Sequence, residues 1–204
     1  MARPRDVEKT RDLALRAAAV LEREGLGLPT EQLARHLGVK RPTLLYHLPT
    51  YARVVEITLA DLLAEQAAFV AAAVDRHEHP IDRIDARVRA IHAFHRGREG
   101  RLLFLTQAVA VTGGGQALDI ARAAASFFEE SRADMVRRVE EGIAAGVVEP
   151  CDARALVGLA RAVIDGLTIQ SVTDGASAEP IHAMFWERVL APLKRRPTKG
   201  GKRR

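Results

Sequence analysis

The stretch TEQLARHLGVKRPTLLYHLPTYARVVEIT, residues 30 to 58, decides the fold. Thr30 stands where a side-chain oxygen can accept hydrogen bonds from the first backbone N–H groups of a helix. Gly38 stands where a left-handed residue ends a helix. Pro42 suits the first turn of the next helix, because the N–H it lacks is not needed there, and Pro49 ends that helix. The stretch therefore predicts two short helices joined by a tight turn, ahead of a longer helix.

The apolar residues of this stretch fall on one side of both short helices. Leu44 and Leu48 are four residues apart and share a face, and the small side chain of Ala34 allows two helices to cross closely. The residues expected to face inward are Leu33, Leu37, Val39, Leu44 and Leu48. This arrangement is typical of a helix-turn-helix. The alternative is an ordinary helical hairpin with a solvated polar face.

The remaining side chains of the second short helix suit the major groove of DNA. Arg41 can bind guanine O6 and N7, while hydroxyl and imidazole groups can bind phosphates or base edges. Pro42 and Leu45 can contact thymine methyl groups. The residues expected to point outward are Pro42, Thr43 and Tyr46, with Leu45 and His47 on the flanks and Arg41 at the start.

Residues 7 to 58 resemble the DNA-binding region of the tetracycline-repressor (TetR) family of regulators. The shared features are a leading helix, a capped second helix, Gly-Val, a Thr-Leu-aromatic recognition helix, and a fourth helix after a polar cap. The resemblance implies phosphate contacts from Thr30 and Thr43 and a DNA backbone contact from Tyr51. It places Arg41, Pro42, Leu45, Tyr46 and His47 in the major groove. The family usually has Tyr where this chain has Leu45 and Lys where it has Tyr51, so one aromatic hydroxyl and one cation are missing.

The rest of the chain also predicts helices, because Ala, Leu, Arg and Glu dominate and alternating strand patterns are missing. We expect an all-α protein of about nine helices. Beyond the two short helices, the expected ranges are 6–24, 51–75, 82–97, 101–111, 116–145, 152–173 and 178–195. The expected domains are a helix-turn-helix domain of three helices over 1–50, an effector-binding and dimerisation domain over 51–195, and a disordered basic tail over 196–204.

Two functions of the second domain follow from the resemblance and from its composition. The resemblance implies that the helices at 152–173 and 178–195 pair with their copies in a homodimer, although intramolecular packing is the alternative for their apolar residues. A cavity lined by aromatic and a few polar groups would suit a small organic effector, although plain core packing is the alternative for each Phe. The candidate effector-binding residues are Phe94, Phe104, Gln107, Phe128, Asp165 and Thr168.

Charge is distributed unevenly along the chain. The net charge is +5, but residues 1 to 55 hold 10 Lys and Arg against 6 Asp and Glu, whereas residues 56 to 193 hold 14 against 20. Residues 194 to 204 hold 7 basic residues and no acidic one. Basic ends beside an acidic middle favour contact of both ends with a polyanion. For the tail, a merely solubilising role is the alternative.

Other functional classes find little support in the sequence. Cys151 is the single cysteine, so no internal disulfide or cysteine zinc site is expected. The pairs His92–His95 and His77–His79 have metal-ligand spacing, with solvated histidines as the alternative, and no cofactor is expected. No nucleophile elbow, HExxH, P-loop or dinucleotide-binding glycine motif occurs, which argues against an enzyme. The N-terminus is too charged for a signal peptide, and no run of uncharged apolar residues is long enough to span a bilayer.

These observations predict a cytoplasmic, ligand-responsive transcriptional regulator of the helix-turn-helix type. We expect a repressor that binds palindromic double-stranded operator DNA as a homodimer and is released by a small organic effector. The alternatives are a helical small-molecule-binding or scaffold protein without specific DNA binding, and an all-α enzyme.

Overall fold

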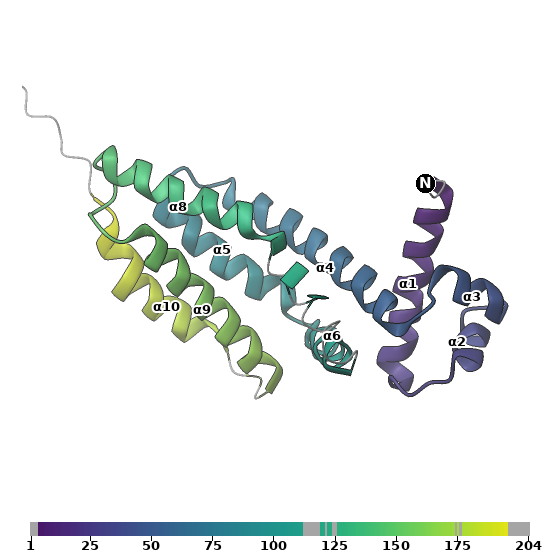
Figure 1. Cartoon of the computed structure of the whole chain (residues 1–204). Coiled ribbons are helices and arrows are strands. Elements are labelled where there is room, and N and C mark those ends of the chain that lie inside the picture. The colour runs from purple at the N-terminus through teal and green to yellow at the C-terminus, as the bar shows by residue number, and fades with distance from the viewer. Residues whose placement is uncertain are drawn as a thin grey trace, which may run out of the picture. The chain divides into compact units, whose positions relative to one another are not determined.

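The computed structural model describes residues 4–111, 119–120, 122–123, 126–173, 175 and 177–195. Within these ranges the regular secondary structure is helical, apart from an isolated antiparallel bridge between Val148 and Lys194. The α-helices, shown in Figure 1, are α1 (Pro4–Glu24), α2 (Thr30–His36), α3 (Arg41–His47), α4 (Tyr51–Val74), α5 (Pro80–His95), α6 (Glu99–Val111), α8 (Glu129–Ala144), α9 (Ala153–Thr173) and α10 (Glu179–Phe185). The all-α prediction is confirmed.

The chain forms two compact units. Unit 1 comprises residues 1–65 and 98–127, and unit 2 comprises residues 66–97 and 128–204. The helix α4 contributes its first part to unit 1 and its second part to unit 2. The functional division expected at residue 50 stays a prediction, and the expected disordered tail at 196–204 lies outside the described residues.

Unit 1 is built around the apolar face of α1. The apolar face of this helix is buried, since Leu13, Ala14, Ala17, Ala18 and Leu21 are at most 3% exposed. At the start of α4 the backbone N–H of Arg53 donates to Thr50 Oγ1 at 3.2 Å, so Thr50 caps the helix. Thr30 does not cap α2: it is the first residue of the helix, and Pro29 precedes it without a side-chain hydrogen bond.

By length and composition, α4 is the one helix of the described chain that is long and apolar enough to cross a membrane. Two of its buried polar side chains nevertheless have partners from other helices, whereas Thr58 Oγ1 has no hydrogen-bond partner in the described chain. Asp61 is paired with Arg11 of α1, and Gln66 Oε1 lies 2.9 Å from His95 Nε2 of α5. Such partners are those of a helix packed within a protein core, because a polar group in hydrocarbon would be left unsatisfied.

Unit 2 packs α8, α9 and α10 around α5, as Figure 1 shows. The centre of the core holds Ile81, Ile84 and Val88 of α5, which are at most 1% exposed. The second half of α4 adds a smaller apolar cluster through Val70 and Val74, which pack with α5 residues. Unit 2 therefore has an apolar core of its own.

Two predicted helix ranges differ from the structure. The predicted helix 116–145 is interrupted, because Phe128 lies in a turn and α8 starts at Glu129, where two glutamates favour a helix N-terminus. Residues 112–118 lie outside the described residues. The predicted helix 178–195 changes to a π-helical turn at Trp186–Leu190 and a 3₁₀ turn at Ala191–Leu193. Pro192 explains why a regular α-helix does not continue, because it has no N–H for the hydrogen-bond ladder.

Candidate nucleic-acid interface

The turn between α2 and α3 has the geometry that the sequence predicted. Gly38 adopts a φ of +67°, the left-handed conformation that glycine accommodates best. The backbone N–H groups of Gly38 and Val39 donate to the carbonyls of Arg35 and Ala34 at 3.1 and 3.0 Å. From α1, Arg16 Nη2 donates to the carbonyl of Leu37 at 2.7 Å, so α1 supports the end of α2. The turn is held on both sides.

The apolar face of α2 and α3 is buried as expected. Leu33, Leu37, Leu44 and Leu48 are between 1 and 4% exposed, and Val39 is half-buried. These side chains hold the two short helices against each other and against α1. The opposite face of α3 is thereby fixed in orientation.

The outer face of α3 carries the residues predicted to read DNA. Tyr46 is 75% exposed, Arg41 and Pro42 are exposed, Leu45 is 37% exposed, and Thr43 is half-buried. No ion pair holds Lys40 or Arg41 within the described chain, and the first turn of α3 contains no acidic residue. Two cations therefore stand without a counter-ion at the positive end of a helix, where they cost stability unless an anion binds.

Thr30 and Tyr51 lie at the edge of this face. Both are half-buried and line a shallow groove of about 70 Å³ together with Leu45, Pro49 and Thr50. The Tyr51 hydroxyl donates a hydrogen bond to the carbonyl of Leu28. Tyr51 therefore ties the start of α4 to the loop before α2, and its oxygen can still accept a hydrogen bond.

His47 lies on the inner side of α3 rather than on the flank where the sequence placed it. It is 8% exposed, and its Nδ1 lies 2.7 Å from Thr10 Oγ1 of α1. The polar partner on α1 explains why an imidazole occupies a position between the buried Leu44 and Leu48. Its role in contacting DNA stays a prediction.

The six candidate effector residues are divided between the two units. Phe104 is buried and Gln107 is exposed on α6 in unit 1. In unit 2, Phe94 is buried against Phe69, with ring centroids 5.7 Å apart, and Phe128 is half-buried before α8. Asp165 is exposed and paired with Arg161 at 3.3 Å, whereas Thr168 is half-buried. Only Thr168 among them has a buried oxygen, Oγ1, without a hydrogen-bond partner in the described chain.

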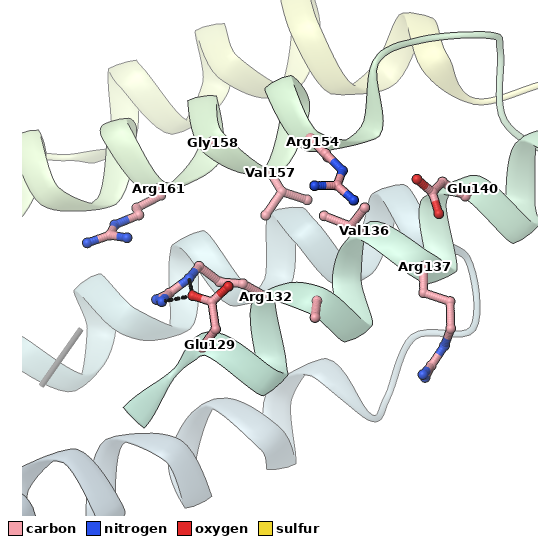
Figure 2. A pocket seen from close by; sticks show the side chains of 10 residues that line it. Glu129, Arg132, Val136, Arg137, Glu140, Arg154, Val157, Gly158 and Arg161 are labelled. Atoms are coloured by element: carbon pink, nitrogen blue, oxygen red, sulfur yellow. Dashed lines mark hydrogen bonds and ion pairs between the residues drawn. The ribbon is translucent and has the colours of Figure 1, made fainter. Parts of the chain in front are cut away.

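A second concave surface lies between α8 and α9 in unit 2 (Figure 2). It has a volume of about 430 Å³ and an apolar floor that includes Val136 and Val157. Arginines line its sides, and three of them have acidic partners: Arg132 pairs with Glu129, Arg137 with Asp134, and Arg161 with Asp165. Sequence reasoning did not identify this groove, because its residues meet only when α8 and α9 pack.

The histidines form a pair that their spacing did not predict. His92 Nδ1 of α5 lies 2.8 Å from His182 Nε2 of α10, and His92 Nε2 lies 3.1 Å from the carbonyl of Ile164 on α9. His95 faces Gln66 instead, so the His92–His95 pair that has metal-ligand spacing in the sequence does not converge. The described residues contain no group of three or more His, Cys, Asp or Glu placed to hold a metal.

Burial lowers the pKa of both paired histidines. For His92, loss of hydration is the main cause, and hydrogen bonds to backbone carbonyls oppose it. For His182, loss of hydration is again the main cause, followed by the neighbouring His92 and Arg89, while Glu179 and Asp85 act in the opposite direction. Both rings are therefore held neutral in the core that joins α5, α9 and α10.

No protein-family model matches the chain, and no curated protein gives a significant match. Solved structures do match along almost its whole length. The TetR family transcriptional regulator PfmR from Thermus thermophilus is 17% identical, with a TM-score of 0.63 over 90% of this chain and 99% of that one. A putative transcriptional regulator from Saccharomonospora viridis, in complex with choline, is 20% identical, with a TM-score of 0.69 over 93% and 100%.

A third similar structure contains both classes of ligand that the sequence predicted. AibR in complex with isovaleryl coenzyme A and operator DNA is 16% identical, with a TM-score of 0.58 over 86% of this chain and 97% of that one. The resemblance first drawn from residues 7 to 58 thus extends to the fold of the whole chain. The chain has the fold of the TetR-family transcriptional regulators.

Proposed function

We propose that the protein is a ligand-responsive, one-component transcriptional regulator, a repressor, that reads double-stranded DNA with α3. The observation that carries this proposal is the exposed outer face of α3, where Arg41 has no ion pair within the described chain and Tyr46 is 75% exposed. A solvated surface helix gains nothing from an exposed aromatic ring beside uncompensated cations. A DNA major groove offers both phosphates and base edges to such a face.

We assign DNA reading to residues 1–50, with Arg41, Pro42, Leu45 and Tyr46 toward the major groove. Thr30, Thr43 and Tyr51 are assigned to the phosphate backbone, and His47 supports the same face from within. Effector binding and dimerisation are assigned to residues 51–195.

Exposed apolar side chains on α9 and α10 support a homodimer. Ile169 is 64% exposed, Leu159 is 45% exposed, and Met184 is 65% exposed. Leu159, Ala162, Gly166 and Ile169 recur at three- and four-residue intervals, so they form one stripe along α9. Such a stripe suits burial against a second copy, because contiguous exposed apolar surface usually marks an interface. Two copies related by a two-fold axis would present two α3 helices to a palindromic operator.

A small organic effector is proposed to control this dimer through residues 51–195. The neighbours that contain choline and isovaleryl coenzyme A support this class of ligand for the fold. Phe94, Phe104, Gln107, Phe128, Asp165 and Thr168 remain the candidate contacts. Effector binding would change the spacing of the two α3 helices, and a small change suffices because both must fit successive major grooves. This function places the protein in the cytoplasm with the DNA and needs neither a catalytic group nor a cofactor.

Charge reversal at α3 tests the proposal. Arg41→Glu should lower affinity for a selected duplex by roughly 10- to 100-fold, because a bidentate base contact contributes about 1–3 kcal/mol. Arg76→Glu is the matched control, since Arg76 is exposed in the turn after α4 and has no ion pair within the described chain. Fluorescence anisotropy at fixed salt concentration measures the DNA affinity of both variants. Equal DNA affinities for the Arg41→Glu variant and the wild type would contradict the assignment of α3 as the helix that reads DNA.

A further inference from the structure

We infer that His47 is a positioning residue that locks α3 onto α1 through its Nδ1–H group, rather than a residue that acts by donating to DNA. The inference rests on the proposed function, because it concerns how the reading helix is held. It starts from three groups on two helices: the carbonyl of Asp6, the hydroxyl of Thr10 and the imidazole of His47.

The hydrogen-bond donors in this chain of groups can be assigned one by one. Thr10 Oγ1 lies 2.6 Å from the carbonyl oxygen of Asp6, which can only accept, so the single hydroxyl proton of Thr10 points there. Thr10 Oγ1 also lies 2.7 Å from His47 Nδ1. Because the hydroxyl proton is already used, Nδ1 must carry the proton and donate to Thr10. In the neutral ring this leaves Nε2 as an acceptor.

Burial gives this hydrogen bond its importance. His47 is 8% exposed, so an imidazole that lost its partner would keep a polar N–H group in a mostly dry site. The bond joins residues that are 37 positions apart and lies at the last turn of α3. It therefore fixes the end of α3 relative to α1, while the buried leucines fix the rest.

The ring of His47 also supports an exposed reading residue. Tyr46 packs edge-on against it, with ring centroids 5.0 Å apart and an angle of 85° between the planes. Edge-to-face packing is a favourable aromatic geometry and restricts the rotamer of the outer ring. His47 thus sets the direction of Tyr46, which is 75% exposed, while its own ring stays mostly buried.

Two pairs of variants separate positioning from direct DNA contact. In His47→Asn the amide nitrogen stands near the place of Nδ1 and can still donate to Thr10, whereas in His47→Gln it stands near the place of Nε2. Thr10→Ser keeps the hydroxyl, and Thr10→Val removes it at nearly constant shape. We expect the Thr10→Ser variant to bind a selected duplex within about threefold of the wild type. The His47→Asn variant keeps the N–H donor but loses the ring that packs on Tyr46, so it should bind more tightly than His47→Gln but less tightly than the wild type. The His47→Gln and Thr10→Val variants should lose about tenfold, the effect of one buried hydrogen bond.

The opposite order would overturn the inference. If His47→Gln bound like the wild type while His47→Asn lost affinity, Nε2 would act directly on DNA. Equal binding by all four variants would also contradict positioning. The Thr10 pair keeps the test decisive if a His47 variant fails to fold.

A measurement without DNA separates failure of this inference from failure of the proposed function. Nitrogen-15 NMR of the histidine side chains at neutral pH should show a protonated Nδ1 for His47 in the wild type, and loss of its slow solvent exchange in Thr10→Val. A His47 ring protonated only at Nε2 would refute the inference whether or not the protein binds DNA. Absence of any selected duplex for the wild type would refute the proposed function alone.

Discussion

Arg11 of α1 is paired with Asp61 of α4, with Arg11 Nε donating to Asp61 Oδ1 at 2.6 Å. The Asp61 side chain is 7% exposed, whereas that of Arg11 is 59% exposed. The guanidinium thus reaches from solvent to a carboxylate that the packing of unit 1 has removed from water. The helix α1 also supports α2 through Arg16 and α3 through Thr10. The ion pair therefore fixes the helix against which α2 and α3 pack.

Removal of the cation should destabilise the protein. We predict that Arg11→Leu lowers the free energy of unfolding by about 1–2 kcal/mol, because a mostly buried carboxylate loses its partner while solvent at the exposed arginine limits the effect. Arg23→Leu is the control on the same helix, since Arg23 and its partner Glu24 are both exposed. Its effect should stay within about 0.5 kcal/mol. Urea unfolding measures both, and equal effects would contradict the role assigned to the Arg11–Asp61 pair.

Alanine substitution at two helical glycines should change the stability of the protein in opposite directions. At Gly142 of α8 an added Cβ would lie 2.8 Å from Val148 Cγ2 and 3.1 Å from Pro80 Cγ. Val148 is fully buried and β-branched, so it cannot move away easily, and Gly142→Ala should cost about 1–3 kcal/mol before the gain in helix propensity.

Gly158 of α9 is the matched control, because an added Cβ there meets nothing within 4 Å. Gly158→Ala should raise stability by up to about 1 kcal/mol through helix propensity. Thermal unfolding followed by circular dichroism compares the two variants. A Gly142→Ala variant as stable as Gly158→Ala would contradict the close approach of α8 to Val148.

Stability should fall in acid because of the histidine pair. Burial lowers the pKa of His182 and of His92, so the unfolded chain binds protons more readily than the folded one below the ordinary histidine pKa of about 6.5. The contribution to stability is therefore complete above that pH and is lost as the pH falls below it.

His182→Gln should flatten this dependence. Its amide can still donate to His92 Nδ1, but it does not titrate. We expect the variant to lose less unfolding free energy than the wild type between roughly pH 7 and pH 5. Urea unfolding at each pH gives the comparison. Parallel curves for the two proteins would show that His182 is not held neutral by the fold.

A charge on the apolar stripe of α9 should dissociate the proposed dimer. Ile169→Glu would bury a carboxylate at the interface, so we expect dimer affinity to fall by more than about tenfold. Val147→Glu is the control, because Val147 is also an exposed apolar residue but lies in the turn after α8. Sedimentation velocity over a concentration series measures the dimer affinity of both variants. A dimer that persists unchanged in Ile169→Glu would place the interface elsewhere.

The parts of the fold that depend on local sequence were predictable. Gly38 and Pro42 each constrain a helix end through their own backbone, and the structure places both as expected. The outward direction of Tyr46 follows from its spacing to Leu44 and Leu48 in the same way.

The features that depend on distant partners were not predictable. His47 turned inward because Thr10, on another helix, offers it a hydroxyl. His92 pairs with His182, which lies 90 positions away, rather than with the nearby His95. Periodicity locates a helix face, but it does not identify the side chain that a second helix will bring to it.

Selection of bound sequences from a random double-stranded DNA pool, by the purified protein at about physiological salt, tests the central claim most directly. The proposed regulator should enrich a palindrome whose half-sites are separated by about one helical turn, roughly 10 base pairs, because two α3 helices of a dimer must enter successive major grooves. Enrichment of no sequence, with only weak binding that salt abolishes, would contradict the proposal.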